Sequence, residues 1–136
     1  MRFVVYFTAL KQSFADEAGI NMDFRKTSGR KKENKMVIEM MGDVKLEKLV
    51  GADIMGDKLG LYARVVVPPH TAVPYHKHEG NGEVYYFLTG EGQYDDNGTV
   101  RTVKPGDVTW TPDGSSHGVV NNGDTDLTFM ALIINS

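Results

Sequence analysis

The second half of the chain consists of short runs in which apolar and polar residues tend to alternate. A period of two residues is typical of β strands that bury one face. The alternation predicts strands at residues 60–67, 72–77, 83–89, 91–95, 99–104, 107–111, 116–121 and 126–134. Turn-forming residues fill the gaps, and Asn97-Gly98 predicts a hairpin because both residues tolerate positive φ. Short strands at this spacing, without a long helix, predict an all-β sandwich or closed barrel.

The residues before 60 give a weaker pattern. Segment 44–55 is mixed, because apolar residues recur there at helical spacing while glycines interrupt the run. The β character begins at about Met36. We therefore expect a β-barrel domain at residues 36–136, preceded by an N-terminal extension and basic linker at residues 1–35.

Within the extension, Phe3–Phe7 predicts a short apolar strand or a buried turn, and Ser13 is a candidate N-cap for a brief helical turn. Residues 25–35 are strongly basic. We interpret them as a solvated linker, with attraction of anions as the alternative.

Composition and charge exclude several classes of function. The chain of 136 residues is 40% hydrophobic and 24% charged, which is ordinary for a globular domain, and it has no cysteine for disulfides or thiolate chemistry. No apolar run is long enough to span a membrane, and no signal peptide is evident, so we expect a cytoplasmic protein. Residues 36–136 carry seven Lys/Arg and fourteen Asp/Glu, which argues against nucleic-acid binding by this part.

Three of the four histidines lie in a pattern that suits metal binding. His76 and His78 are two residues apart, so on a strand both imidazoles point to one face, about 7 Å apart. Glu83 begins the next strand after a glycine-rich connection, and His117 begins a later one. A lone His-x-His usually binds nothing, but imidazole nitrogens with a carboxylate oxygen suit Mn, Fe, Co, Ni, Cu or Zn. We expect one such divalent metal per chain.

The spacing of these residues resembles the two motifs of the cupin superfamily. The first family motif runs Gly, five residues, His-x-His, three or four residues, Glu, six residues, Gly, and the chain matches it from His76 to Gly90. The second runs Gly, five residues, Pro-x-Gly, two residues, His, three residues, Asn. Its matching residues are Gly106, Pro112, Gly114, His117 and Asn121. The short stretch between the motifs is similar to that of small single-domain bacterial cupins.

This resemblance implies a cupin-type double-stranded β-helix, or jelly-roll barrel, with His76, His78, Glu83 and His117 as metal ligands. One position departs from the family pattern, because His70 replaces the first glycine of the first motif. Histidine tolerates positive φ better than most residues, so we expect His70 in a turn, with a fifth metal ligand as the alternative.

Other residues are candidates for the surroundings of the metal. Tyr85 and Phe87 share the face of Glu83 if the strand is regular, and Trp110 and Met130 are further pocket candidates. Each could instead fill the core. The Tyr85 hydroxyl is our preferred group beside the metal ligands. Asn121, four residues after His117, either ties down the end of its strand or belongs to the following turn.

The function remains open between two classes. Four protein ligands leave two positions of an octahedral metal free, which favours small anionic or chelating ligands. One interpretation is a metal-dependent enzyme acting on a small organic molecule, as an oxygenase, decarboxylase or isomerase. The alternative is a non-catalytic cupin that binds or senses a small ligand, because the fold is shared by both classes. The resemblance also implies a homodimer that forms through sheet edges and N-terminal segments.

Overall fold

The computed structural model describes residues 36–136. The predictions of a strand or buried turn at Phe3–Phe7, a helical turn near Ser13 and a linker at 25–35 lie outside the described residues.

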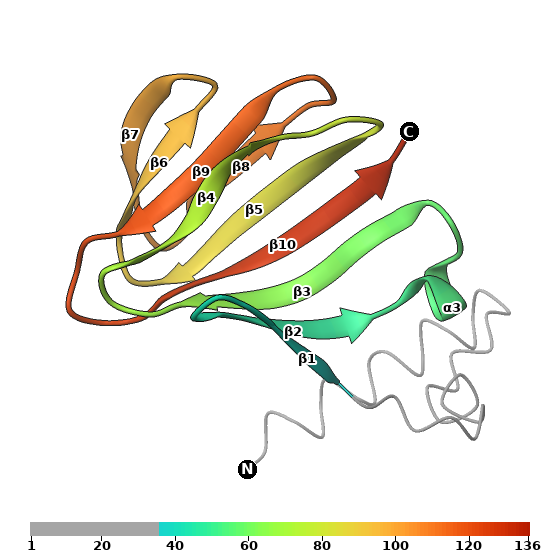
Figure 1. Cartoon of the computed structure of the whole chain (residues 1–136), viewed down its shortest axis with the longest axis horizontal. Helices are drawn as coiled ribbons and strands as arrows, with labels where there is room; N and C mark the ends of the chain where they lie inside the picture. The colour runs from blue at the N-terminus through green and yellow to red at the C-terminus, as the bar shows by residue number, and fades with distance from the viewer. Residues whose placement is uncertain (1–35) are drawn as a thin grey trace, which may run out of the picture. The chain divides into compact units, whose positions relative to one another are not determined.

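Two antiparallel sheets form the domain (Figure 1). The larger has six strands in the order β1 (Val37–Met41), β2 (Val44–Val50), β3 (Leu59–Val67), β10 (Leu127–Asn135), β5 (Asn81–Thr89) and β8 (Val108–Thr111). The smaller has four, in the order β4 (Thr71–Lys77), β9 (Ser116–Asn121), β6 (Gly92–Asp96) and β7 (Thr99–Val103). This arrangement confirms the predicted all-β jelly-roll barrel.

The core lies between the two sheets. Buried residues alternate with more exposed ones along strands such as β3 and β10, as the period of two requires. The largest side chains with almost no exposure include Tyr94, Phe87 and Phe129, and the rings of Phe87 and Phe129 lie 5.2 Å apart. Burying an apolar side chain of this size stabilises the fold by about 1.5–3 kcal/mol. Tyr94 brings a hydroxyl into this apolar layer, and that hydroxyl needs a polar partner.

Two predicted turns have the expected backbone. Asn97 and Gly98 have φ of 52° and 93° and join β6 to β7, which confirms the hairpin. His70 has φ of 57° and lies between β3 and β4 with an exposed side chain, 3.2 Å from the Asp124 carboxylate. His70 is therefore a turn residue, as predicted.

The segment of mixed pattern folds mainly as strand. Its first part forms β2, where Val44 is fully buried and Leu46 pairs with Val65 of β3. Pairing with a neighbouring strand overrides the local helical spacing, because strand formation depends strongly on such contacts. The only helix in the described part is α3 (Ala52–Met55), so residues 36–136 contain no helix long and apolar enough to cross a membrane.

Candidate metal centre

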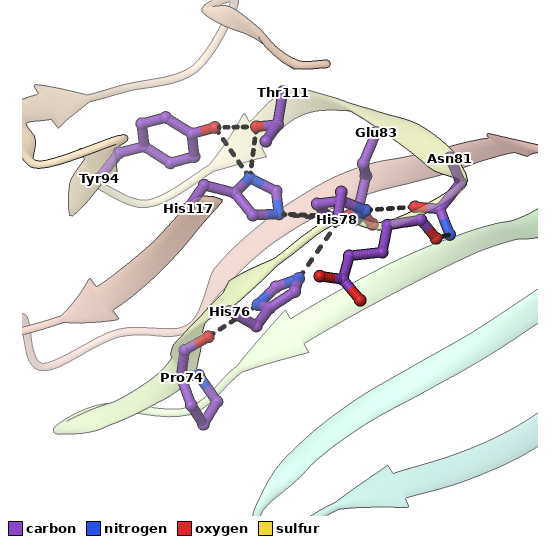
Figure 2. A network of polar contacts seen from close by, with 9 residues as sticks. Pro74, His76, His78, Asn81, Glu83, Tyr94, Thr111 and His117 are labelled. Carbon is purple, nitrogen blue, oxygen red and sulfur yellow. Dashed lines mark hydrogen bonds and ion pairs between the residues drawn. The ribbon is translucent and has the colours of Figure 1, made fainter. Parts of the chain in front are cut away.

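The four predicted ligands come from both sheets and meet inside the barrel (Figure 2). His76 of β4 and His117 of β9 are direct cross-strand partners in the smaller sheet. His78 follows the last residue of β4, and Glu83 lies on β5 of the larger sheet. A register shift between Val73 and His76 changes the local course of β4 ahead of the two histidines.

The ligand atoms of these side chains all lie within 4.8 Å of one another. The Oε2 atom of Glu83 is 2.9 Å from His117 Nε2 and 3.1 Å from His78 Nε2. His76 Nε2 is 3.9 Å from the same oxygen. The other side chains are almost completely buried, whereas that of His76 is 40% exposed, so the cluster opens to solvent beside His76.

Local contacts fix the orientation of the two histidines near β4. His76 donates its Nδ1 hydrogen to the backbone oxygen of Pro74 over 2.8 Å. His78 donates its Nδ1 hydrogen to the side-chain oxygen of Asn81. Both acceptors are oxygens without a hydrogen to offer, so the hydrogen of each neutral ring must be on Nδ1.

His117 is held by two hydroxyl groups in the core. Its Nδ1 lies 2.8 Å from Thr111 Oγ1 and 2.9 Å from the Tyr94 hydroxyl, and these two oxygens are 2.9 Å apart (Figure 2). This pair can accept the Nδ1 hydrogen of the ring, and the contact gives the Tyr94 hydroxyl a polar partner in the apolar layer.

With the ring hydrogens on Nδ1, the Nε2 lone pairs of the histidines and the Glu83 carboxylate converge on one point. His78 Nε2 and His117 Nε2 are 3.0 Å apart, and each ring has an oxygen beside its Nδ1 that can accept the ring hydrogen. Two lone pairs and a carboxylate at this separation repel one another unless a cation lies among them. Three imidazole nitrogens and one carboxylate oxygen fit a first-row divalent metal.

The protein environment adjusts the charges of this cluster. Burial raises the pKa of Glu83, but contacts with His117 and His76 outweigh burial and bring the pKa below its ordinary value. Burial lowers the pKa of His117, which favours the neutral, ligating form. Contact with Glu83 raises the pKa of His76.

The sequence model described as the Cupin domain matches residues 63–133, just over half of the chain. The chain belongs to the cupin family. A curated relative, the oxalate-binding protein of Thermotoga maritima, is 46% identical over 93 residues, which are 68% of this cupin and 77% of the relative.

Solved structures show the same fold. A structure from Thermotoga maritima, described as a predicted oxalate decarboxylase, is 40% identical with a TM-score of 0.71, and the match covers 75% of this cupin and 95% of that chain. An RmlC-like cupin from Shewanella frigidimarina is 19% identical with a TM-score of 0.64, covering 75% and 86% of the two chains. At that identity the second structure supports the fold alone.

The backbone conformation explains why glycine occupies two positions of the cupin motifs. Gly90 has φ of 78°, and a Cβ atom there would lie 2.5 Å from the backbone oxygen of Asp126. Gly106 also has positive φ, at 93°. Asn121 donates from Nδ2 to the backbone oxygens of Val67 and Thr125 and accepts from the Gly123 N–H, so it both ties down the end of its strand and belongs to the following turn.

The structure separates the predicted pocket residues into two groups. Tyr85 is buried and its ring stacks on that of His117, with centroids 4.8 Å apart, and burial keeps the pKa of its hydroxyl well above the usual value. Phe87 is a buried core residue. The prediction that Trp110 and Met130 line the barrel is wrong, because their strands turn both side chains to the outer face, where Trp110 is 53% exposed.

Sequence reasoning missed the residues that hold the histidines. Thr111 could have been found, because the alternation in 107–111 turns Thr111 inward whenever Trp110 points outward. Tyr94 and Asn81 gave no such signal, since their contacts depend on how β6 and the turn before Glu83 are placed in space.

Proposed function

We propose that this cupin is a metal-dependent binding protein for a small dicarboxylate, with oxalate as the first ligand to test. The observation that carries the proposal is the convergence of three imidazole nitrogens and the Glu83 carboxylate at one point. His76, His78, Glu83 and His117 would hold the ion.

The charge of the site favours an anionic ligand. Three neutral imidazoles and one carboxylate leave a divalent ion with a net charge of about +1, and four protein ligands leave two octahedral positions free. When bound, the metal would supply Lewis acidity and positive charge at those positions. The half-exposed His76 gives a ligand access from solvent. The 46% identity with a protein named as oxalate-binding supports oxalate among small dicarboxylates.

The alternative is that the chain is a metal-dependent enzyme. Among the reactions considered, decarboxylation is favoured by the 40% identical structure described as a predicted oxalate decarboxylase. Conversion of oxalate to formate and carbon dioxide consumes a proton. The one carboxylate in the four-residue cluster is Glu83, which the proposal uses as a ligand, and the Tyr85 hydroxyl holds its proton firmly. Binding is therefore the function that the geometry supports best.

Elemental analysis followed by calorimetry tests the proposal. We expect purified protein to contain about one transition-metal ion per chain, and the loaded protein to bind oxalate but not acetate at the same concentration. Metal-free protein should not bind oxalate measurably, and the shape-matched variant Glu83→Gln should bind both metal and oxalate far more weakly than the wild type. A stoichiometric metal with no heat from oxalate would contradict the dicarboxylate proposal. Formate released from oxalate by the loaded protein would favour the enzyme.

A further inference from the structure

The register between β4 and β9 changes just ahead of the histidine ligands. Val73 pairs with Val119, but the next pair joins His76 to His117. Two residues of β4 therefore lie opposite a single residue of β9, which is the arrangement of a β-bulge. The members of this β4 bulge are Pro74 and Tyr75 on β4 and Gly118 on β9.

The β4 bulge sets the face of the strand on which the histidines lie. Val73 is buried in the core, and His76 follows three residues later. In a regular strand an odd separation places two side chains on opposite faces, so a buried Val73 would turn His76 and His78 away from the barrel. The extra residue corrects the alternation, and all three side chains lie on the inner face.

Pro74 suits the bulge because of its backbone. Proline has no N–H to donate to a neighbouring strand, so within sheets it is confined to edges and bulges. Both conditions hold here, since β4 is the first strand of the four-stranded sheet. The backbone oxygen of Pro74 accepts the Nδ1 hydrogen of His76 over 2.8 Å, and this contact orients the ring so that Nε2 faces the other ligands (Figure 2).

Gly118 leaves the space that the bulge needs. Gly118 is buried, and a Cβ atom there would lie 2.9 Å from both the Cα atom and the backbone nitrogen of Tyr75. It would also lie 3.1 Å from the backbone oxygen of Val73. The φ angle of Gly118 is not positive, so the close approach of β4, rather than an unusual backbone conformation, requires glycine at this position.

We propose that Gly118 is a positioning residue for the metal site, because it permits the β4 bulge that directs His76 into the ligand cluster. Gly118 has no side chain to offer an ion and acts through the backbone of Tyr75. Between residues 36 and 136, β4 pairs with β9 alone, so a bulge displaced by a larger residue moves outward together with His76. The inference rests on the proposed metal binding and concerns how this chain places one of the four ligands.

The variant Gly118→Ala tests the proposal with cobalt(II) as the probe. We expect the affinity for cobalt(II), measured by competition with a chromophoric chelator, to fall about 10- to 100-fold, as when the support of a ligand is disturbed. The visible absorption of bound cobalt(II), which depends on the ligands and their geometry, should change as well. Circular dichroism establishes that the variant is folded.

Gly92→Ala is the matched control in the same sheet. A Cβ atom at Gly92 would lie 2.7 Å from the Leu127 side chain and 3.0 Å from the backbone oxygen of Val120, so this variant is also overpacked. Gly92 lies four residues along β6 from Asp96, the partner of His117, which is a distance of about 13 Å. Its affinity for cobalt(II) should stay within about twofold of the wild type, with the same absorption spectrum.

The possible outcomes separate this inference from the proposed function. If the wild type binds cobalt(II) and Gly118→Ala binds it equally well, the positioning role is wrong while the metal site stands. An equal loss of affinity in Gly92→Ala would also overturn the positioning role, because overpacking anywhere in the sheet would then explain the effect. A wild-type chain that binds no transition metal would overturn both proposals.

Nitrogen NMR of the metal-free wild type gives a second measurement that needs no variant. At about pH 9 an ordinary histidine is neutral, and we expect His76 to carry its hydrogen on Nδ1, beside the backbone oxygen of Pro74. His70 serves as the reference, because its Nε2 lies 3.2 Å from the Asp124 carboxylate and should carry the hydrogen there. A neutral His76 with its hydrogen on Nε2 would show that the bulge does not orient this ring, and would overturn the proposal.

Discussion

Each histidine of the cluster offers Nε2 because another group occupies Nδ1. For His76 and His78 that group is a single oxygen, whereas His117 is held by the hydroxyls of both Tyr94 and Thr111. A ligand fixed on its far side loses less conformational freedom when it binds a metal. His117 should therefore be the best-ordered ligand.

Removing both hydroxyls should weaken metal binding without removing a ligand. In Tyr94→Phe/Thr111→Val the buried Nδ1 hydrogen of His117 loses its acceptors, and we expect the metal affinity to fall about 10- to 100-fold. Competition with a chromophoric chelator measures this change. Thr109→Val is the matched control, because the Thr109 hydroxyl is buried without a partner among the described residues and its loss should leave the affinity within about twofold. Equal effects of the two changes would contradict the role of the hydroxyl pair.

The glycines at the strand ends differ in what surrounds them, and this difference can be measured. Gly106→Ala should destabilise the fold by about 1–2 kcal/mol, because positive φ is unfavourable for alanine while nothing lies within 4 Å of the new Cβ atom. Gly90→Ala adds a clash with the backbone of Asp126, so we expect a further loss of about 1–3 kcal/mol. Urea unfolding of both variants should rank them in this order, and a reversed order would contradict the backbone geometry at Gly90.

The ion pair between Glu47 of β2 and Arg64 of β3 should make the stability of the domain depend on pH in the acid range. Arg64, together with Lys45, lowers the pKa of Glu47 from 4.5 to about 2. A depressed carboxyl pKa stabilises the fold above pH 4.5 and loses that contribution as the pH falls towards 2. Glu47→Gln should therefore be less stable than the wild type at pH 7, and the difference should narrow below pH 4.5.

Urea unfolding between pH 2.5 and 7, at one protein concentration, measures how the stability difference between wild type and Glu47→Gln changes with pH. Glu39→Gln serves as the control, because Glu39 lies on the exposed strand β1 and its ion pair with Lys48 is worth little. A constant difference between wild type and Glu47→Gln across this range would contradict the prediction.

At the scale of the whole molecule, metal binding should raise the thermal stability of the folded protein. An ion at 100 times its dissociation constant stabilises the folded state by about 2.7 kcal/mol, so removal by a chelator should lower the Tm by about 10 °C. Differential scanning calorimetry of loaded and chelated protein measures this shift. Glu83→Gln should melt at the same temperature with and without chelator, and a chelator effect of wild-type size in this variant would place the metal elsewhere.

The parts of the fold that the sequence predicts correctly are those determined by residues close together in the chain. Strands β3 to β10 were predicted because alternation and turn residues are local signals, and the His-x-His and Glu83 spacing is local as well. The sequence does not predict β1 and β2 because their formation depends on strand pairing, which for β2 is with β3. It wrongly predicts Trp110 inside the barrel because β8 turns its threonines inward and its apolar residues outward. The boundary between residues 1–35 and 36–136, the cytoplasmic location and the homodimer stay predictions.

The ligand cluster straddles the seam between the two sheets. His76 and His117 belong to the four-stranded layer, and Glu83 belongs to the six-stranded layer. An ion bound by all three would therefore cross-link the two layers, which otherwise meet through side-chain packing and a few hydrogen bonds such as that between Tyr94 and Thr111. Movement of one layer relative to the other would break this cross-link. The backbone amides of β4, β5 and β9 should therefore exchange with deuterium more slowly, and to a similar degree, when the site is filled.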